Sequence, residues 1–185
     1  KSTYNGIIGV GGKKGVFSLF SPNSVEPIIK IFAHNGSIND ANFSMEGNYL
    51  TTIGSDNKMK VFDIRKTFNE LYSYSFSREP TSLDVSQNGL VGVSFYETLI
   101  FWKDLFKSKQ SKPYFKHVNN SRNNITDCKF CPYEEFMGIA YNNKFENIFV
   151  PGSGSQSYDT YEANVAGIKK QVRENMVHQI IEKVI

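Results

Sequence analysis

The sequence predicts an all-β protein built from repeated units of short strands, and three observations support this prediction. Three segments alternate in polarity and end in large aromatic residues, Phe20, Phe62 and Trp102, which lie 42 and 40 residues apart. A second marker, Ile38–Ser44, matches Ile125–Cys131 at its Ile, Asp and Phe positions, 87 residues or two periods later. The 15 Phe, 10 Tyr and 14 Gly are typical of strands joined by tight turns. A period of about 40–45 residues with four strands per unit indicates a β-propeller.

The strands follow from period-2 alternation. In chain order the expected strands are residues 7–10, 15–20, 27–32, 38–43, 49–53, 59–64, 81–86, 98–103, 125–131, 136–141 and 146–150. They make about three and a half blades, whereas a closed propeller needs at least about four. Residues 1–150 are therefore expected to be the C-terminal part of a larger, seven-bladed propeller.

The second unit matches the WD-repeat form of the propeller most closely. His34 stands in the Gly-His place, and Phe62-Asp63 stands in the Trp-Asp place. Repeats of this type join the loop His, a strand Ser or Thr (here Thr52 or Ser55) and the turn Asp by hydrogen bonds. Phe62 lacks an indole N–H, so the bonded chain ends before it. The residues expected to lock the blades are His34, Asp56, Phe62, Asp63 and Trp102.

After Val150 the pattern changes. Pro151–Ser157 is too rich in Gly, Ser and Pro for a strand or a helix, so a boundary is expected after residue 150. Residues 158–164 are polar and predicted to be extended. Apolar residues then recur at helical spacing over residues 166–185, which predicts an amphipathic helix. This helix either docks on the propeller or belongs to an arm that binds a partner.

The tail also carries motifs. They are Val150-Pro151-Gly152-Ser153-Gly154, Tyr158-Asp159, Glu162-Ala163-Asn164, Lys169-Lys170-Gln171, Arg173-Glu174, Val177 and Ile181-Glu182-Lys183-Val184. With Phe130–Glu135, Leu50–Arg65 and Gly15–Pro22, they make almost the whole chain resemble the WD-repeat, small-nucleolar-RNA-associated proteins of the small-subunit processome, which combine a propeller with a characteristic C-terminal domain.

This resemblance implies a non-catalytic scaffold in pre-ribosomal RNA processing and small-subunit assembly, located in the nucleus and nucleolus. The implied partners are other processome proteins, with pre-ribosomal or small nucleolar RNA as further candidates. The residues it assigns to a partner-binding arm are Pro151, Gly152, Gly154, Tyr158, Asp159, Glu162 and Asn164. A second hypothesis is a generic WD-repeat adaptor that binds peptides or proteins on its propeller face.

The charges suggest where RNA could bind. The net charge of +3 is too small to argue for a nucleic-acid binder by itself. However, residues 103–122 form a basic insertion in which Phe106, Tyr114 and Phe115 are interleaved with the cations. Single-stranded RNA contacts use this combination. A solvated loop is the plainer interpretation. The candidate RNA contacts are Lys107, Lys109, Lys112, Lys116 and Arg122, with Lys169, Lys170 and Arg173 in the tail.

Other chemistry finds little support. Cys128 and Cys131 form a lone CxxC pair without the four ligands that zinc needs, so both are expected to be buried structural cysteines. Residues 9–15 fit no phosphate-binding motif and are expected to include a turn between strands. No nucleophile, base and orienting group occur together, and no run approaches the ~18 apolar residues of a membrane span. We therefore expect no enzyme, metal, cofactor, membrane contact or small-molecule substrate.

Overall fold

The computed structural model describes residues 1–3, 5–65, 68–119 and 123–155, and the single positions Lys170, Arg173, Glu174 and Val177. The chain divides into two compact units, residues 1–155 and residues 156–185. Among the described residues of the first unit, all regular structure is antiparallel β-sheet. No helix in the part of the chain that the structure describes is long and apolar enough to cross a membrane.

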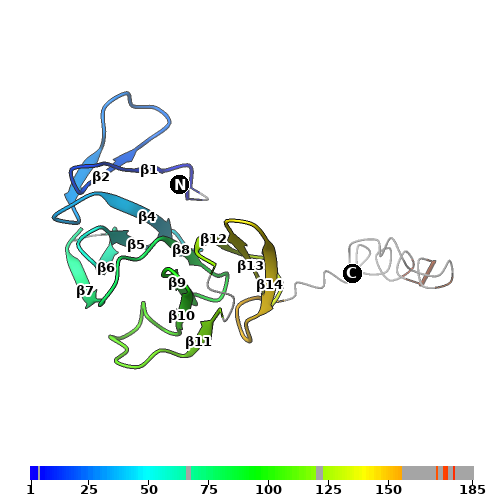
Figure 1. Cartoon of the computed structure of the whole chain (residues 1–185). Helices are drawn as coiled ribbons and strands as arrows, with labels where there is room; N and C mark the ends of the chain where they lie inside the picture. Colours follow the sequence, from blue (N-terminus) through cyan, green and yellow to red (C-terminus); the bar gives the residue numbers. More distant parts are fainter. Residues whose placement is uncertain are drawn as a thin grey trace. The chain divides into compact units, whose positions relative to one another are not determined.

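Fourteen strands in the described ranges form four sheets. The first blade contains β1 (Ile8–Gly11), β2 (Val16–Phe20) and β3 (Ile29–Phe32); the second β4 (Ile38–Phe43), β5 (Tyr49–Gly54), β6 (Lys58–Asp63) and β7 (Glu70–Ser75); the third β8 (Ser82–Val85), β9 (Val91–Ser94), β10 (Thr98–Trp102) and β11 (Phe115–Val118); and the fourth β12 (Ile125–Phe130), β13 (Phe136–Tyr141) and β14 (Phe145–Phe149). Within each blade the strands pair in chain order (Figure 1).

The predicted strands agree with these bounds to within about two residues, with three omissions. β7, β9 and β11 were missed, and β11 lies inside the segment interpreted as a basic insertion. β7 and β11 are the outermost strands of their blades, and most of their residues are exposed or half-buried, so they lack the apolar alternation that marks the inner strands. β9 is only four residues long and includes Gly92 and Ser94, so its apolar pattern is too short to stand out. The turn between β1 and β2 lies within residues 9–15, as expected.

Three hydrophobic clusters fill the spaces between consecutive blades. Phe17, Phe43 and Leu50 are among the buried residues between the first and second blades. Ile53, Leu83 and Trp102 belong to the cluster between the second and third, and Phe101, Met137 and Ile139 to the cluster between the third and fourth. The inner strands β4, β8 and β12 lie toward the centre of this arrangement (Figure 1).

Candidate nucleic-acid interface

The basic segment, defined here as residues 103–116, leaves the end of β10 and returns as β11. Asp104 has a positive φ of 56° and begins a tight turn, in which its carbonyl oxygen accepts the N–H of Lys107 at 3.1 Å. Leu105 is fully buried in the cluster between the second and third blades. The segment is therefore fixed to the propeller from its first residues.

An aromatic stack attaches the segment to the second blade. The rings of Phe106 and Tyr49 lie 5.1 Å apart at an interplanar angle of 14°. The guanidinium of Arg65 lies 5.0 Å from the centroid of the Tyr49 ring, and a Cβ on Gly89 would contact Phe106 at 3.6 Å. Phe106 is thus a packing residue, contrary to its expected place among the RNA-facing aromatics.

Three further contacts hold the rest of the segment. The backbone N–H of Gln110 donates to the Tyr74 hydroxyl at 2.9 Å, and the Lys109 ammonium lies 5.9 Å from the centroid of the same ring. The Tyr114 hydroxyl donates to the carbonyl oxygen of Pro151 at 3.4 Å. The segment is therefore a belt along the rim of two blades rather than a freely solvated loop.

The lysines of the belt all face solvent. Lys107 forms an ion pair with Asp104 at 2.7 Å, and the hydrogen bond from Lys107 holds the pKa of the Asp104 carboxyl below its ordinary value. The remaining exposed lysines of the belt are Lys103, Lys109, Lys112 and Lys116. Tyr114 and Phe115 remain partly exposed beside them, whereas Arg122 lies outside the described residues. The belt thus combines cations with two available aromatic rings.

The hydrogen bonds expected around His34 are present. Nδ1 of His34 lies 2.8 Å from Oδ1 of Asp56, and Nε2 lies 2.8 Å from the Thr52 hydroxyl, so Thr52 rather than Ser55 is the strand partner. Burial lowers the pKa of His34 and outweighs the opposing effect of Asp56. A neutral ring can then donate from Nδ1 to the carboxylate and accept from the Thr52 hydroxyl.

The other predicted locking residues lie in the blades. Phe62 packs in the cluster between the first and second blades, and Trp102 in the next one. The carboxylate of Asp63 pairs with Arg65 at 2.8 Å at the end of β6. Their locking role remains a prediction.

The first residues of the predicted arm are attached to the propeller. The Gly152 N–H donates to Glu135 Oε1 at 2.7 Å, and the Ser155 hydroxyl donates to Asn88 Oδ1 at 2.7 Å. Ser153 is 2% exposed. The compact unit therefore extends to Ser155, five residues beyond the boundary expected from Pro151.

Five of the ten tail residues predicted to bind partners or RNA lie outside the described part. They are Tyr158, Asp159, Glu162, Asn164 and Lys169. Lys170 and Arg173 are exposed at helical positions, as the predicted helix requires. The Lys170 ammonium lies 3.9 Å from Glu174, an i,i+4 pair.

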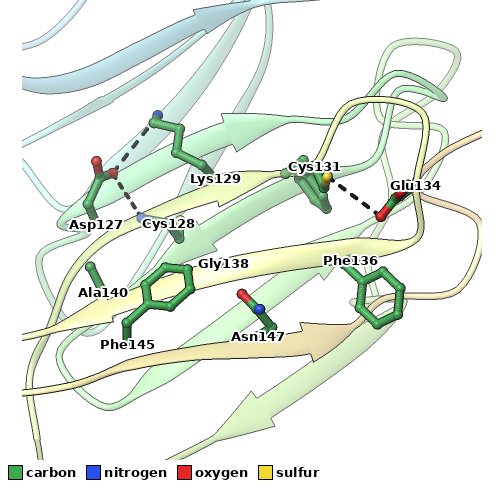
Figure 2. A pocket seen from close by; sticks show the side chains of 11 residues that line it. Asp127, Cys128, Lys129, Cys131, Glu134, Phe136, Gly138, Ala140, Phe145 and Asn147 are labelled. Atoms are coloured by element: carbon green, nitrogen blue, oxygen red, sulfur yellow. Dashed lines mark hydrogen bonds and ion pairs between the residues drawn. The ribbon is translucent and has the colours of Figure 1, made fainter.

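The two cysteines differ. Cys128 is buried, and burial raises the pKa of its thiol to about 12. Cys131 is exposed, so the prediction that both are buried was wrong for this residue, which lies just past the end of β12 in the connection to β13 (Figure 2). Within the described ranges, no three His, Cys, Asp or Glu side chains group as a metal site.

Sequence reasoning missed a polar network along the inner strands. Asp40, Ser82 and Asp127 stand at matching repeat positions, and the Ser82 hydroxyl is 2.6 Å from Asp127 Oδ1 and 3.3 Å from Asp40 Oδ2. Asn42 and Asp84 also stand at matching repeat positions, and the Asn42 side-chain amide donates to Asp84 Oδ1 at 2.5 Å. The Asp shared by the repeat markers Ile38–Ser44 and Ile125–Cys131 was the sequence feature that could have revealed this network.

Comparison with known proteins finds a matching family model and several similar proteins. A family model described as the BING4CT (NUC141) domain matches residues 113–185. U3 small nucleolar RNA-associated protein 7 of Saccharomyces cerevisiae is 31% identical over 99% of this chain and 36% of that protein. The WD repeat-containing proteins 46 of Caenorhabditis elegans and Homo sapiens are 31% and 29% identical over 97% and 100% of this chain. The chain spans about a third of the length of these relatives.

Solved structures share the fold. A chain in the crystal structure of the mitotic checkpoint complex matches with a TM-score of 0.68 and 13% identity, covering 82% of this chain and 50% of that chain. The Cps50 (Swd1) β-propeller domain of Myceliophteria thermophila matches with a TM-score of 0.69 and 12% identity, covering 81% and 52%. These likenesses confirm the predicted all-β propeller.

Proposed function

Because this chain belongs to the WD-repeat proteins that carry a BING4CT (NUC141) domain, we propose that it is a non-catalytic scaffold of the small-subunit processome. In this role it assists pre-ribosomal RNA processing and small-subunit assembly in the nucleolus. The observation that carries the proposal is the similarity, over 99% of the chain, to a protein named for its association with U3 small nucleolar RNA. The family resemblance inferred from the tail motifs is confirmed.

The geometry supports a scaffold. Blades joined by buried apolar clusters present rigid surfaces on which partners can assemble. His34 and Asp56, the closest approach to an acid–base pair, are bonded to each other and to Thr52 inside the second blade. These hydrogen bonds are accounted for by packing within the second blade, and no catalytic role is needed to explain them. Other processome proteins are the proposed partners of the propeller surfaces and of residues 151–164.

The belt is the proposed RNA-binding surface. Lys109, Lys112 and Lys116 are exposed, and the rings of Tyr114 and Phe115 on the same segment are partly exposed. The attachments at Phe106, Gln110 and Tyr114 hold the belt before RNA arrives, so little ordering entropy opposes binding. Ammonium groups can contact the phosphates while bases stack on the rings.

Affinity purification from cells, followed by sequencing of the bound RNA, tests the scaffold role. We expect enrichment of pre-ribosomal RNA and of U3 small nucleolar RNA. Recovery of proteins unrelated to ribosome assembly, without these RNAs, would instead favour the generic adaptor.

A charge-neutralising variant tests the belt separately. Replacing Lys109, Lys112 and Lys116 with Gln should weaken crosslinking to RNA and reduce the salt dependence of binding by about 0.7 per lost phosphate contact. The matched control replaces Lys13, Lys14 and Lys30, which are equally exposed and lie in the first blade. If both variants crosslink like the unmodified protein, the belt makes no RNA contact, although the scaffold role can stand.

A further inference from the structure

Residues 151–155, which we call the strap, show how a turn between the first two strands of a blade can bind a peptide segment. In the turn between β8 and β9, Asn88 donates from Nδ2 to the carbonyl oxygen of Gly152 at 3.1 Å. Asn88 Oδ1 accepts the Ser155 hydroxyl at 2.7 Å, and Gln87 Oε1 accepts the Ser155 N–H at 3.4 Å. Two amide side chains of the third blade thus hold a segment that follows β14 of the fourth blade.

The turn between β4 and β5 in the second blade has the same backbone form. Its residues 44–47 precede residues 86–89 of the third blade by 42 positions, and both turns begin with Ser and end with Gly. In both, the Ser carbonyl oxygen accepts the Gly N–H, at 2.8 and 3.1 Å, and the φ of the Gly is positive, 70° and 80°. The Ser hydroxyl accepts the N–H four positions later in each, at 3.2 and 2.9 Å. Met45 and Glu46 therefore occupy the positions from which the third blade binds the strap.

A hollow of about 440 Å³, which we call the groove, lies between these two turns. Met45 and Glu46 line it from the second blade, residues 87–89 from the third, and Phe106 and Lys107 from the belt. Met45 is 57% exposed, so a large apolar side chain is available there. Since residues 87 and 88 both hold the strap and line the groove, the groove borders the strap and leads from it to the second blade.

The residues of the second turn change what can bind beside it. An amide side chain both donates and accepts, whereas the Glu46 carboxylate only accepts. Asn48 Nδ2 donates to Glu46 Oε2 at 2.9 Å, and no Lys or Arg of the described ranges forms an ion pair with Glu46. The other carboxylate of the groove, Asp104, is already neutralised by Lys107 at 2.7 Å. The groove thus has one uncompensated negative charge next to the apolar side chain of Met45.

From the strap as a template and from this charge, we propose that the groove binds a peptide segment of another processome protein in which a basic side chain stands beside an apolar one. The Lys or Arg of that segment pairs with Glu46, and the apolar side chain lies on Met45. That the partner belongs to the processome rests on the proposed function, whereas the chemistry of the segment rests on the groove alone. RNA is disfavoured as the occupant because its phosphates would meet the Glu46 carboxylate.

Photocrosslinking tests the groove in the assembled particle. The full-length protein is expressed in cells with a photoreactive amino acid in place of Met45, irradiated and purified, and the crosslinked peptide is identified by mass spectrometry. We expect a peptide of a processome protein with a Lys or Arg within about two residues of the crosslinked position, the reach of a short peptide segment. The same amino acid in place of Val25, which is 98% exposed in the first blade, is the control and should not yield this peptide.

A charge reversal tests the role of Glu46. Glu46→Lys should lower the yield of the Met45 crosslink about tenfold or more, because two positive charges then face each other. The matched control is Glu26→Lys, the same change at an exposed position of the first blade, which should leave the yield unchanged. Replacing the basic residue of the crosslinked peptide with Glu should restore the yield in Glu46→Lys, a rescue that a misfolded variant would not show.

A Met45 crosslink to RNA or to residues 156–185 of the same chain would overturn the inference, as would the absence of a crosslink or an unchanged yield in Glu46→Lys. Copurification of U3 small nucleolar RNA tests the scaffold role separately. If this RNA is recovered without the crosslink, the groove is rejected and the scaffold role stands. A crosslink of the expected chemistry to a protein unrelated to ribosome assembly would uphold the groove and contradict the scaffold role.

Discussion

Nδ1 of His34 lies 2.8 Å from Oδ1 of Asp56, across 22 residues of sequence. The bond joins the loop that enters β4 to the turn between β5 and β6, and the Thr52 hydroxyl holds the opposite side of the imidazole. The ring also covers Gly54, where a Cβ would lie 2.6 Å from its Cγ. Asp56, Thr52 and Gly54 thus fit around one buried side chain, that of His34.

Replacing His34 with Ala should destabilise the first unit by about 2–4 kcal/mol, because Thr52 and Asp56 lose their partner and a cavity remains. Urea denaturation measures this change in the free energy of unfolding. His117→Ala, on the outer strand β11, is the control and should cost less than about 1 kcal/mol. Equal losses for both variants would contradict the locking role of His34.

Stability should also depend on pH through His34. Burial lowers the folded-state pKa of His34 below the unfolded value of about 6.5, so the unfolded state binds more protons between these two values. The contribution of His34 to the free energy of unfolding is fully present above about pH 6.5. It decreases on acidification, by at most about 1.4 kcal/mol per pH unit.

Unfolding free energies measured from pH 8 to pH 5 test this dependence, with His34→Gln as a variant that cannot titrate. The nearest carboxyl, Asp56, has a lowered pKa: burial raises it, but the bonds from His34 and from backbone N–H groups outweigh burial, so its titration falls below this window. A profile of unmodified protein that matches the variant would show that His34 is not the titrating group.

Much of the fold was readable from the sequence because burial on both faces of a blade imposes regular apolar spacing. β13 was predicted at its observed bounds, and β4 likewise. β7 and β11 were not, because these outermost strands are exposed and their pairing is set by neighbours such as β6 and β10. The buried strand β9 was also missed, because its four residues include Gly92 and Ser94 and give only a short apolar pattern. Exposure and strand length therefore decide how much of a strand its own sequence reveals.

The candidate site was predictable in composition but not in contacts. The lysines of residues 103–116 were apparent as a basic run. That Phe106 would pack on Tyr49, 57 residues earlier, depends on the arrangement of two blades. The attachment of Ser155 to Asn88 likewise joins residues 67 positions apart, whereas the Gly-rich sequence alone indicated only a boundary after residue 150.

Where the tail begins, two glycine variants should distinguish backbone strain at Gly152 from steric overlap of a side chain at Gly154. Gly152 has a φ of +77°, but a Cβ there would meet open space, so Gly152→Ala costs only about 1–2 kcal/mol of backbone strain. A Cβ on Gly154 would overlap the carbonyl oxygen of Glu134, so Gly154→Ala must displace the segment. Hydrogen exchange of the Asn88 amide, which donates to Ser153, reports the attachment. It should become unprotected in Gly154→Ala and remain measurably protected in Gly152→Ala.

Phe106→Ala should separate the packing role of the belt from its RNA role. We expect a loss of about 1–3 kcal/mol, since the ring is half-buried between Tyr49 and Gly89. A double-mutant cycle with Tyr49→Ala should give a coupling energy of about 0.5–1.5 kcal/mol, the range of aromatic pairs. By contrast, Tyr114→Ala should weaken RNA crosslinking with a smaller effect on stability, because its ring is 46% exposed. Additive losses at residues 49 and 106 would show that the stack carries no energy beyond the burial of each ring, and the belt would then be held by Leu105, Gln110 and Tyr114 alone.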